Sequence, residues 1–190
     1  MNETNLSKSV ASATDFLYGI LADVRAMLLS LEAAMEQAGW RSVTKKIATA
    51  NLNSTLQGEW LLWWCYRFYA PMDAGESFDR LVAIVCNLGP PEGAEHDYAT
   101  LLAAAVRFPQ PTNFDEIYNS WNSTLSVCRA ALERPDISIL TTSEYADFSP
   151  HASAVAAIAF PLCELTSEQE INTRLVKPLL AAEALLGAQS

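Results

Sequence analysis

Apolar side chains recur every three or four residues through the first part of the chain. Thr14 can cap the start of a helix there, and Gly39 can end it in a left-handed conformation. The pattern therefore predicts a helix of about six turns over residues 14–39, and we expect residues 1–12 to be flexible. The predicted helix carries one apolar stripe, whose members are Leu17, Ile20, Leu21, Val24, Met27, Leu28, Leu31 and Met35.

Three stretches with the character of β-strands follow the helix. Residues 59–71 are rich in aromatic side chains, and residues 81–88 are β-branched and end before a Gly-Pro-Pro turn. Residues 98–108 are apolar and rich in alanine. Because short connections join these stretches, we predict that they pair as antiparallel strands. The preceding residues 41–57 show no sustained period and predict a long surface loop.

The second half of the chain alternates between helical and extended patterns. Asn113 and Glu116 have the spacing of a capping box, and the apolar period after them predicts a helix over residues 114–133. Residues 153–160 predict a fourth strand, and residues 137–140 have a short extended character before it.

The last predicted helix contains a proline. Thr166 and Gln169 have the spacing of a second capping box, and the apolar positions after them continue past Pro178 to Gly187. Proline lacks a backbone donor and crowds the carbonyl of Arg174, so we expect a kink or a break at this point.

These elements together predict one α+β domain that spans residues 1–190, in the order α-β-β-β-α-β-α. We expect a mainly antiparallel sheet of about four strands with three amphipathic helices packed on it. No internal repeat or linker composition divides the chain.

Composition and charge exclude several classes of function. Hydrophobic residues make up 51% of the chain, and 12 basic residues against 22 acidic ones leave a net charge of −10. This balance disfavours nucleic-acid binding, which needs lysine and arginine opposite phosphates. The chain has no signal-peptide pattern and no apolar run near the ~20 residues of a membrane span. We therefore predict a soluble, cytoplasmic protein that binds neither nucleic acid nor membrane.

The common motifs of catalysis and of cofactor binding are missing. The chain contains no GxGxxG or GxxxxGK[ST] phosphate loop and no GxSxG nucleophile elbow. Its four cysteines are separated by 21, 42 and 35 positions, form no CxxC motif and are interpreted as buried, reduced thiols: Cys65, Cys86, Cys128 and Cys163. We predict no cofactor and no metal site.

The two histidines are the remaining candidates for acid–base or metal chemistry. His151 follows Asp147 by four positions, so the two could form an acid–imidazole pair or provide two metal ligands. His96 lies among carboxylates in an acidic stretch. We favour a surface role for both and predict no catalytic residue.

The aromatic stretch is the most unusual feature of the sequence. It holds six aromatic residues between positions 60 and 69, and as a strand it is apolar on both faces. A sheet covered on one side alternates apolar and polar residues. This strand is therefore either central and covered on both faces, or it meets a ligand or a second subunit. The guanidinium of Arg67 needs an anionic or aromatic partner here, and we favour an internal carboxylate. The candidate binding residues are Trp60, Trp63, Trp64, Arg67 and Tyr69.

Two functions are compatible with these patterns. We favour a non-catalytic intracellular module that self-associates or binds a protein partner through the aromatic strand. The alternative is a protein that binds a small anionic molecule, or a small enzyme, with a pocket near Arg67 or His151.

Overall fold

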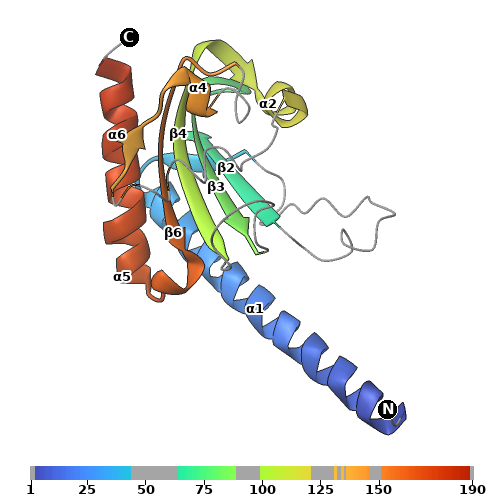
Figure 1. Cartoon of the computed structure of the whole chain (residues 1–190). Coiled ribbons are helices and arrows are strands. Elements are labelled where there is room, and N and C mark those ends of the chain that lie inside the picture. Colours follow the sequence, from blue (N-terminus) through green and yellow to red (C-terminus); the bar gives the residue numbers. More distant parts are fainter. Residues whose placement is uncertain are drawn as a thin grey trace.

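The computed structural model describes residues 3–43, 64–88, 99–120, 131, 134, 136–145 and 151–188. A long N-terminal helix precedes an antiparallel sheet, and the chain ends in a second helical segment (Figure 1). The order of the elements is α1 (Glu3–Gln37), β1 (Trp40–Ser42), β2 (Trp64–Pro71), β3 (Ser77–Asn87), β4 (Thr100–Asn113), α2 (Phe114–Ser120), β5 (Ser138–Ile139), α4 (Thr142–Tyr145), β6 (Ala154–Pro161), η2 (Leu162–Glu164), α5 (Glu168–Glu170), η3 (Ile171–Val176) and α6 (Lys177–Ala188).

The six strands form one sheet in the order β1-β2-β3-β4-β6-β5, and every neighbouring pair is antiparallel. The predicted α+β class with an antiparallel sheet is confirmed. The predicted number of about four strands is wrong, because β1 and β5 extend the sheet at its two edges. β5 falls within residues 137–140, for which the sequence indicates a short extended character, whereas β1 falls within the predicted loop; with two and three residues, both are too short to show an alternating pattern.

Strand β1 shows why residues 41 and 42 do not form a loop. Gly39 ends α1 with a φ of 83°, as the sequence predicts, and turns the chain back along β2. Trp40 is buried, and the Arg41 guanidinium donates hydrogen bonds to the carbonyl oxygens of Ala74 and Gly75. Contacts with residues distant in sequence therefore hold this strand in place.

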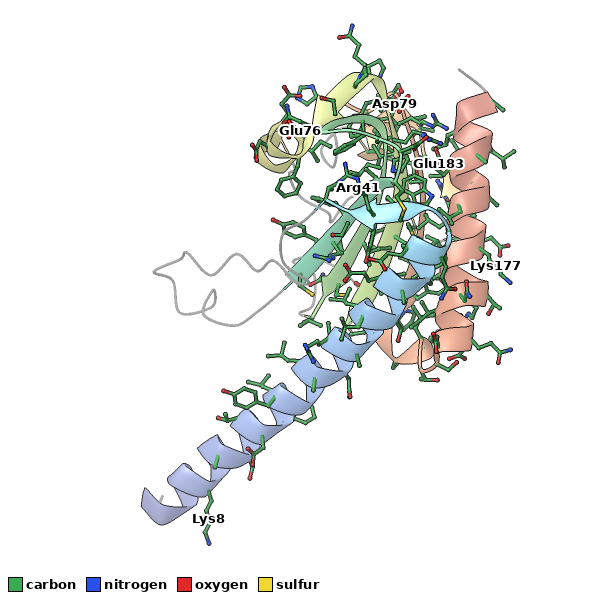
Figure 2. The ribbon with its side chains drawn as sticks, turned by 180° about the vertical axis from the view of Figure 1, so that it is seen from behind. Lys8, Arg41, Glu76, Asp79, Lys177 and Glu183 are labelled. Carbon is green, nitrogen blue, oxygen red and sulfur yellow. The ribbon has the colours of Figure 1, made fainter. Side chains whose placement is uncertain are left out.

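Helices cover the sheet on both faces. The C-terminal part of α1 and the segment formed by α5, η3 and α6 lie side by side on one face (Figures 1 and 2). Their apolar side chains share a core with residues such as Tyr69 of β2 and Ile84 of β3. The alternate residues of the same strands, such as Phe68 and Val85, form a second core with Ile117 of α2. The sheet is thus buried on both faces.

Helix α1 is longer than the sequence predicts. It begins at Glu3, so the predicted start at Thr14 is wrong. Residues 3–13 contain neither proline nor glycine, and nothing in them interrupts a helix. The first half of the helix extends away from the sheet (Figure 1). The expected flexibility of residues 1–12 stays a prediction.

The two predicted capping boxes have different outcomes. At the start of α2, the Glu116 N–H donates to Asn113 Oδ1 at 3.0 Å and the Asn113 N–H donates to Glu116 Oε2, which confirms the first box. The rest of that predicted helix, beyond Ser120, lies largely outside the described residues. The second box begins one residue later than predicted, because Ser167 accepts the bond from the Glu170 N–H.

The predicted irregularity at Pro178 takes the form of a π-helical segment. Residues Ile171–Val176 are π-helical, and the Lys177 N–H donates to the carbonyl of Asn172, five residues before it. The helix returns to α geometry in α6, whose second residue is Pro178. The hydrogen-bond pattern therefore changes from π to α just before Pro178, which has no backbone N–H to donate.

Candidate interaction surface

The predicted binding residues do not form an exposed aromatic surface where they are described. Arg67 and Tyr69 are buried on the face of β2 that α1 covers. Trp64 is the first residue of β2, and only its backbone is described. Trp60 and Trp63 lie outside the described residues. The binding role of these five residues stays a prediction.

Arg67 has the internal carboxylate that we expected from the sequence. Its Nη2 donates to Glu32 Oε1 of α1 at 2.5 Å, and the two side chains are 6% and 21% exposed. This ion pair joins α1 to strand β2 of the sheet. The guanidinium therefore has a partner within the protein. An anionic ligand near Arg67 stays a prediction.

Both faces of the described part of β2 belong to the protein core. Tyr66 and Phe68 lie on the opposite face from Arg67, with ring centroids 5.0 Å apart, and Phe68 also lies against Phe114. On the other face, burial raises the pKa of Tyr69, and the nearby Arg67 only partly opposes this effect. Tyr69 therefore stays protonated at neutral pH. The two-sided apolar pattern here reflects a strand that is covered on both faces.

Among the described residues, the carboxylate of Glu116 lies near His151. A hydrogen bond from Thr112 is the main cause of the lowered pKa of Glu116, and the charge of His151 contributes a small part. His151 lies exposed on a turn before β6, whereas Asp147 and His96 lie outside the described residues. Within the described ranges, no group of three or more His, Cys, Asp or Glu side chains is placed to hold a metal ion. A pocket function near His151 stays a prediction.

A partly buried cluster of charge, which the sequence did not predict, lies between α6 and the sheet. Glu183 of α6 lies 2.7 Å from Arg107 Nη2 and 3.9 Å from Arg80 Nη1, and the two arginines are directly opposite each other in β4 and β3. Gly187 permits this contact, because a Cβ there would lie 2.2 Å from Arg107 Nη2. The cluster attaches the middle of α6, where Glu183 lies (Figure 2), to the sheet. Its signal in the sequence was an acidic residue, Glu183, within an apolar helix.

A second missed feature is a pair of cysteines. Cys65 of β2 and Cys86 of β3 are directly opposite each other, and both thiols are free and buried. The contact is not evident from the sequence, because the two cysteines are 21 positions apart. The hairpin register would have revealed it, because two strands that turn around residues 72–76 bring positions 65 and 86 together.

The most exposed apolar surface lies on the first half of α1. From Val24 to Met35 the apolar stripe is buried in the core beneath the helix. Toward the N-terminus the stripe continues through Ile20, which still packs against that core, to Leu17 and Leu21, which are 44% and 37% exposed. Phe16, which lies beside the stripe, is 69% exposed.

The uncovered surface lies on the same side of α1 as the buried one. Ala13, Leu17 and Ile20 precede Val24 at steps of four and three residues, which keeps them on one side of a helix. Lys8 and Asp15 lie on the opposite side by the same geometry, and Lys8 is near the free end of the helix (Figure 2). We call residues 3–23 the projecting half and residues 24–37 the packed half.

The described helices do not include a membrane span, since none is sufficiently long and apolar over a continuous stretch. Comparison with models of known protein families found no match, and comparisons with curated proteins and with solved structures found none either.

Proposed function

We propose that this protein is a non-catalytic interaction module that self-associates through the projecting half of α1. The observation that carries the proposal is the continuation of the apolar stripe beyond the core that covers its packed half. Exposed leucine and phenylalanine side chains in one contiguous patch are typical of an interaction site. On the grounds of the sequence, we propose that the protein acts in the cytoplasm.

A second copy of the same chain is the partner that fits this surface. The charged residues of the projecting half are Glu3, Lys8, Asp15 and Asp23, none of which is a member of the stripe, and Lys8 and Asp15 lie on the side opposite it. The stripe therefore offers no charge for an ionic partner to recognise and only one basic residue to attract an anionic membrane. An identical apolar stripe is complementary to it, as in two-stranded coiled coils.

The position of the sheet favours an antiparallel pair of helices. The same side of α1 is exposed in the projecting half and covered by the body of the protein in the packed half (Figure 1). In a parallel pair, the bodies of both copies would occupy the same space between the helices. In an antiparallel pair, each body lies beyond the N-terminus of the other copy, and the two projecting halves meet along their whole length.

The size of this contact predicts a weak dimer. The projecting half is about 30 Å long at 1.5 Å per residue. Two helices packed along that length bury on the order of 1,000 Å² in total, which is near the lower limit for a specific interface. We therefore expect dissociation in the micromolar range.

The proposal is tested by the oligomeric state of three forms of the protein in sedimentation velocity experiments over a range of concentrations. We expect the unmodified chain to dimerise and the variant with Leu17→Asp and Leu21→Asp to remain monomeric, because each charge would be buried in the interface. The matched control is Leu29→Asp. Leu29 is 39% exposed on the same helix but lies on the side opposite the stripe, so this variant should dimerise normally.

Two results would overturn the proposal. One is a chain that stays monomeric at several hundred micromolar. The other is a dimer that all the variants retain, which would assign the interface to another surface. Circular dichroism and thermal melting of each variant confirm that it is folded.

The orientation is tested with a spin label at Asp23→Cys, in a background with Cys128 and Cys163 replaced by serine. In an antiparallel pair centred near Ala13, the two labels are about 30 Å apart along the helix axis. A separation of about 10–15 Å, set by the spacing between helices, would indicate a parallel pair instead.

A further inference from the structure

Cys65 and Cys86 form a cross-strand pair near the open end of the β2–β3 hairpin. The hairpin turns at residues 72–76, and the last paired residues at its other end are Trp64 and Asn87. The two cysteines form the next pair along and point into the core that α1 and α6 cover. Two thiols therefore lie adjacent in the folded protein.

The backbone geometry of this position is compatible with a covalent bond. Directly opposite residues in antiparallel strands have Cα atoms about 4.5 or 5.5 Å apart, depending on the type of pair. Cysteines joined by a disulfide have Cα atoms about 4.4–6.8 Å apart. Both types of pair fall within that range, so the bond would form without separating or shifting the strands.

The two thiols also differ in acidity. The hydrogen bond that the Cys86 thiol donates lowers the pKa of Cys65. The same hydrogen bond raises the pKa of Cys86, and complete burial acts in the same direction. The shared hydrogen bond therefore allows one sulfur to ionise while the other keeps its proton.

We propose that Cys65 and Cys86 are a thiol–disulfide modification site whose oxidant is a hydroperoxide. The opposed position of the two residues in the hairpin carries this inference, which is independent of self-association through α1.

The reaction proceeds in two steps that balance. The Cys65 thiolate attacks an oxygen of hydrogen peroxide, the O–O bond breaks, and the departing hydroxide takes up the proton released by the thiol to form water. Cys65 is then a sulfenic acid. The Cys86 sulfur attacks the Cys65 sulfur, the S–O bond breaks, and the released hydroxide takes the Cys86 proton as a second water. Two thiols have lost two electrons, and one peroxide has been reduced.

Burial determines how fast this reaction is. Both thiols are shielded from solvent, so the oxidant reaches them when the ends of β2 and β3 open transiently. The exposed Cys163 should react faster with peroxide but lies opposite no cysteine in the described sheet. The buried pair is therefore distinguished by its product, an internal disulfide, and not by its rate.

The test uses the folded full-length chain with Cys128→Ser and Cys163→Ser, treated with hydrogen peroxide. We expect an intact mass lower by about 2 Da, a peptide pair linked through positions 65 and 86, and full reversal by dithiothreitol. In the matched variant that also carries Cys65→Ser, the mass should not fall, and oxygen atoms should be added at Cys86 instead.

The unmodified chain provides the decisive comparison, because all four cysteines compete there. Linkage of 65 to 86 in the folded protein supports the site. Linkage of either residue to 128 or 163 overturns it, and so does a bond that forms only after denaturation. Sedimentation of the oxidised protein is a separate measurement, so failure of the disulfide leaves the test of self-association unaffected.

Discussion

The two halves of α1 carry the same apolar pattern but have different surroundings. In the packed half, Leu28, Leu31 and Met35 are buried against the sheet and against η3. In the projecting half, Leu17 and Leu21 continue the same stripe with no cover among the described residues. One amphipathic helix thus has both a core-forming segment and an exposed one.

This difference shows what helical periodicity measures. A period of three to four residues predicts that one side of a helix will be covered, but it does not identify the covering surface. The packed half uses its own chain as the cover. For the projecting half, we propose a second copy.

The largest difference between the halves should appear in stability. Leu31→Ala removes a fully buried side chain and should lower the free energy of unfolding by about 3 kcal/mol. Leu17→Ala should change it by less than about 0.5 kcal/mol, because Leu17 lies outside the core of its own chain. Urea denaturation at a nanomolar protein concentration, well below the expected dissociation constant, measures both. Equal losses of unfolding free energy in the two variants would contradict the proposed difference in burial between the packed half and the projecting half.

The ion pair between Glu32 and Arg67 should rank next. Glu32→Ala leaves a buried guanidinium without its carboxylate and should cost about 2–4 kcal/mol in urea denaturation. Glu36→Ala, an exposed acidic residue one turn further along α1, is the matched control and should have little effect. The double variant with Glu32→Leu and Arg67→Met should recover most of the loss, because it leaves no buried charge. A loss of similar size in the double variant would show that the effect arises from packing.

The smallest expected effect is at the helical segment that supports the packed half. Both α5 and η3 contact α1, and hydrogen bonds from Thr166 and Ser167 lower the pKa of Glu170, the last residue of α5. A pKa that is lower in the folded state than in the unfolded state stabilises the protein above the unfolded value. That contribution is lost as the pH falls from about 4.3, the usual glutamate pKa, toward the lower folded value.

Thermal melting between pH 7 and pH 3 measures this contribution. We expect Glu170→Gln to reduce the fall in melting temperature below about pH 4.5 and Glu168→Gln, in the same turn, to leave it unchanged. If both variants behave like the unmodified chain, the hydrogen bonds at Glu170 do not stabilise the helical segment that packs against α1.

The sequence by itself determined the class of the fold and its four central strands. β2, β3, β4 and β6 were predictable because each is long enough to show its composition and to end at turn residues. The carboxylate partner of Arg67 was also predictable, because a guanidinium among aromatic side chains requires compensation. The sequence did not reveal which carboxylate pairs with Arg67, since Glu32 is 35 positions away.

Only the tertiary structure decided the edge strand β1, the contacts of the cysteines and the covering of α1. Strand β1 exists because Arg41 reaches carbonyl groups on another turn, and Cys65 meets Cys86 because of a hairpin register. The sequence records the chemical type of each side chain and its local period, whereas these features depend on which distant segments meet. The same apolar stripe is therefore core in one half of α1 and exposed surface in the other.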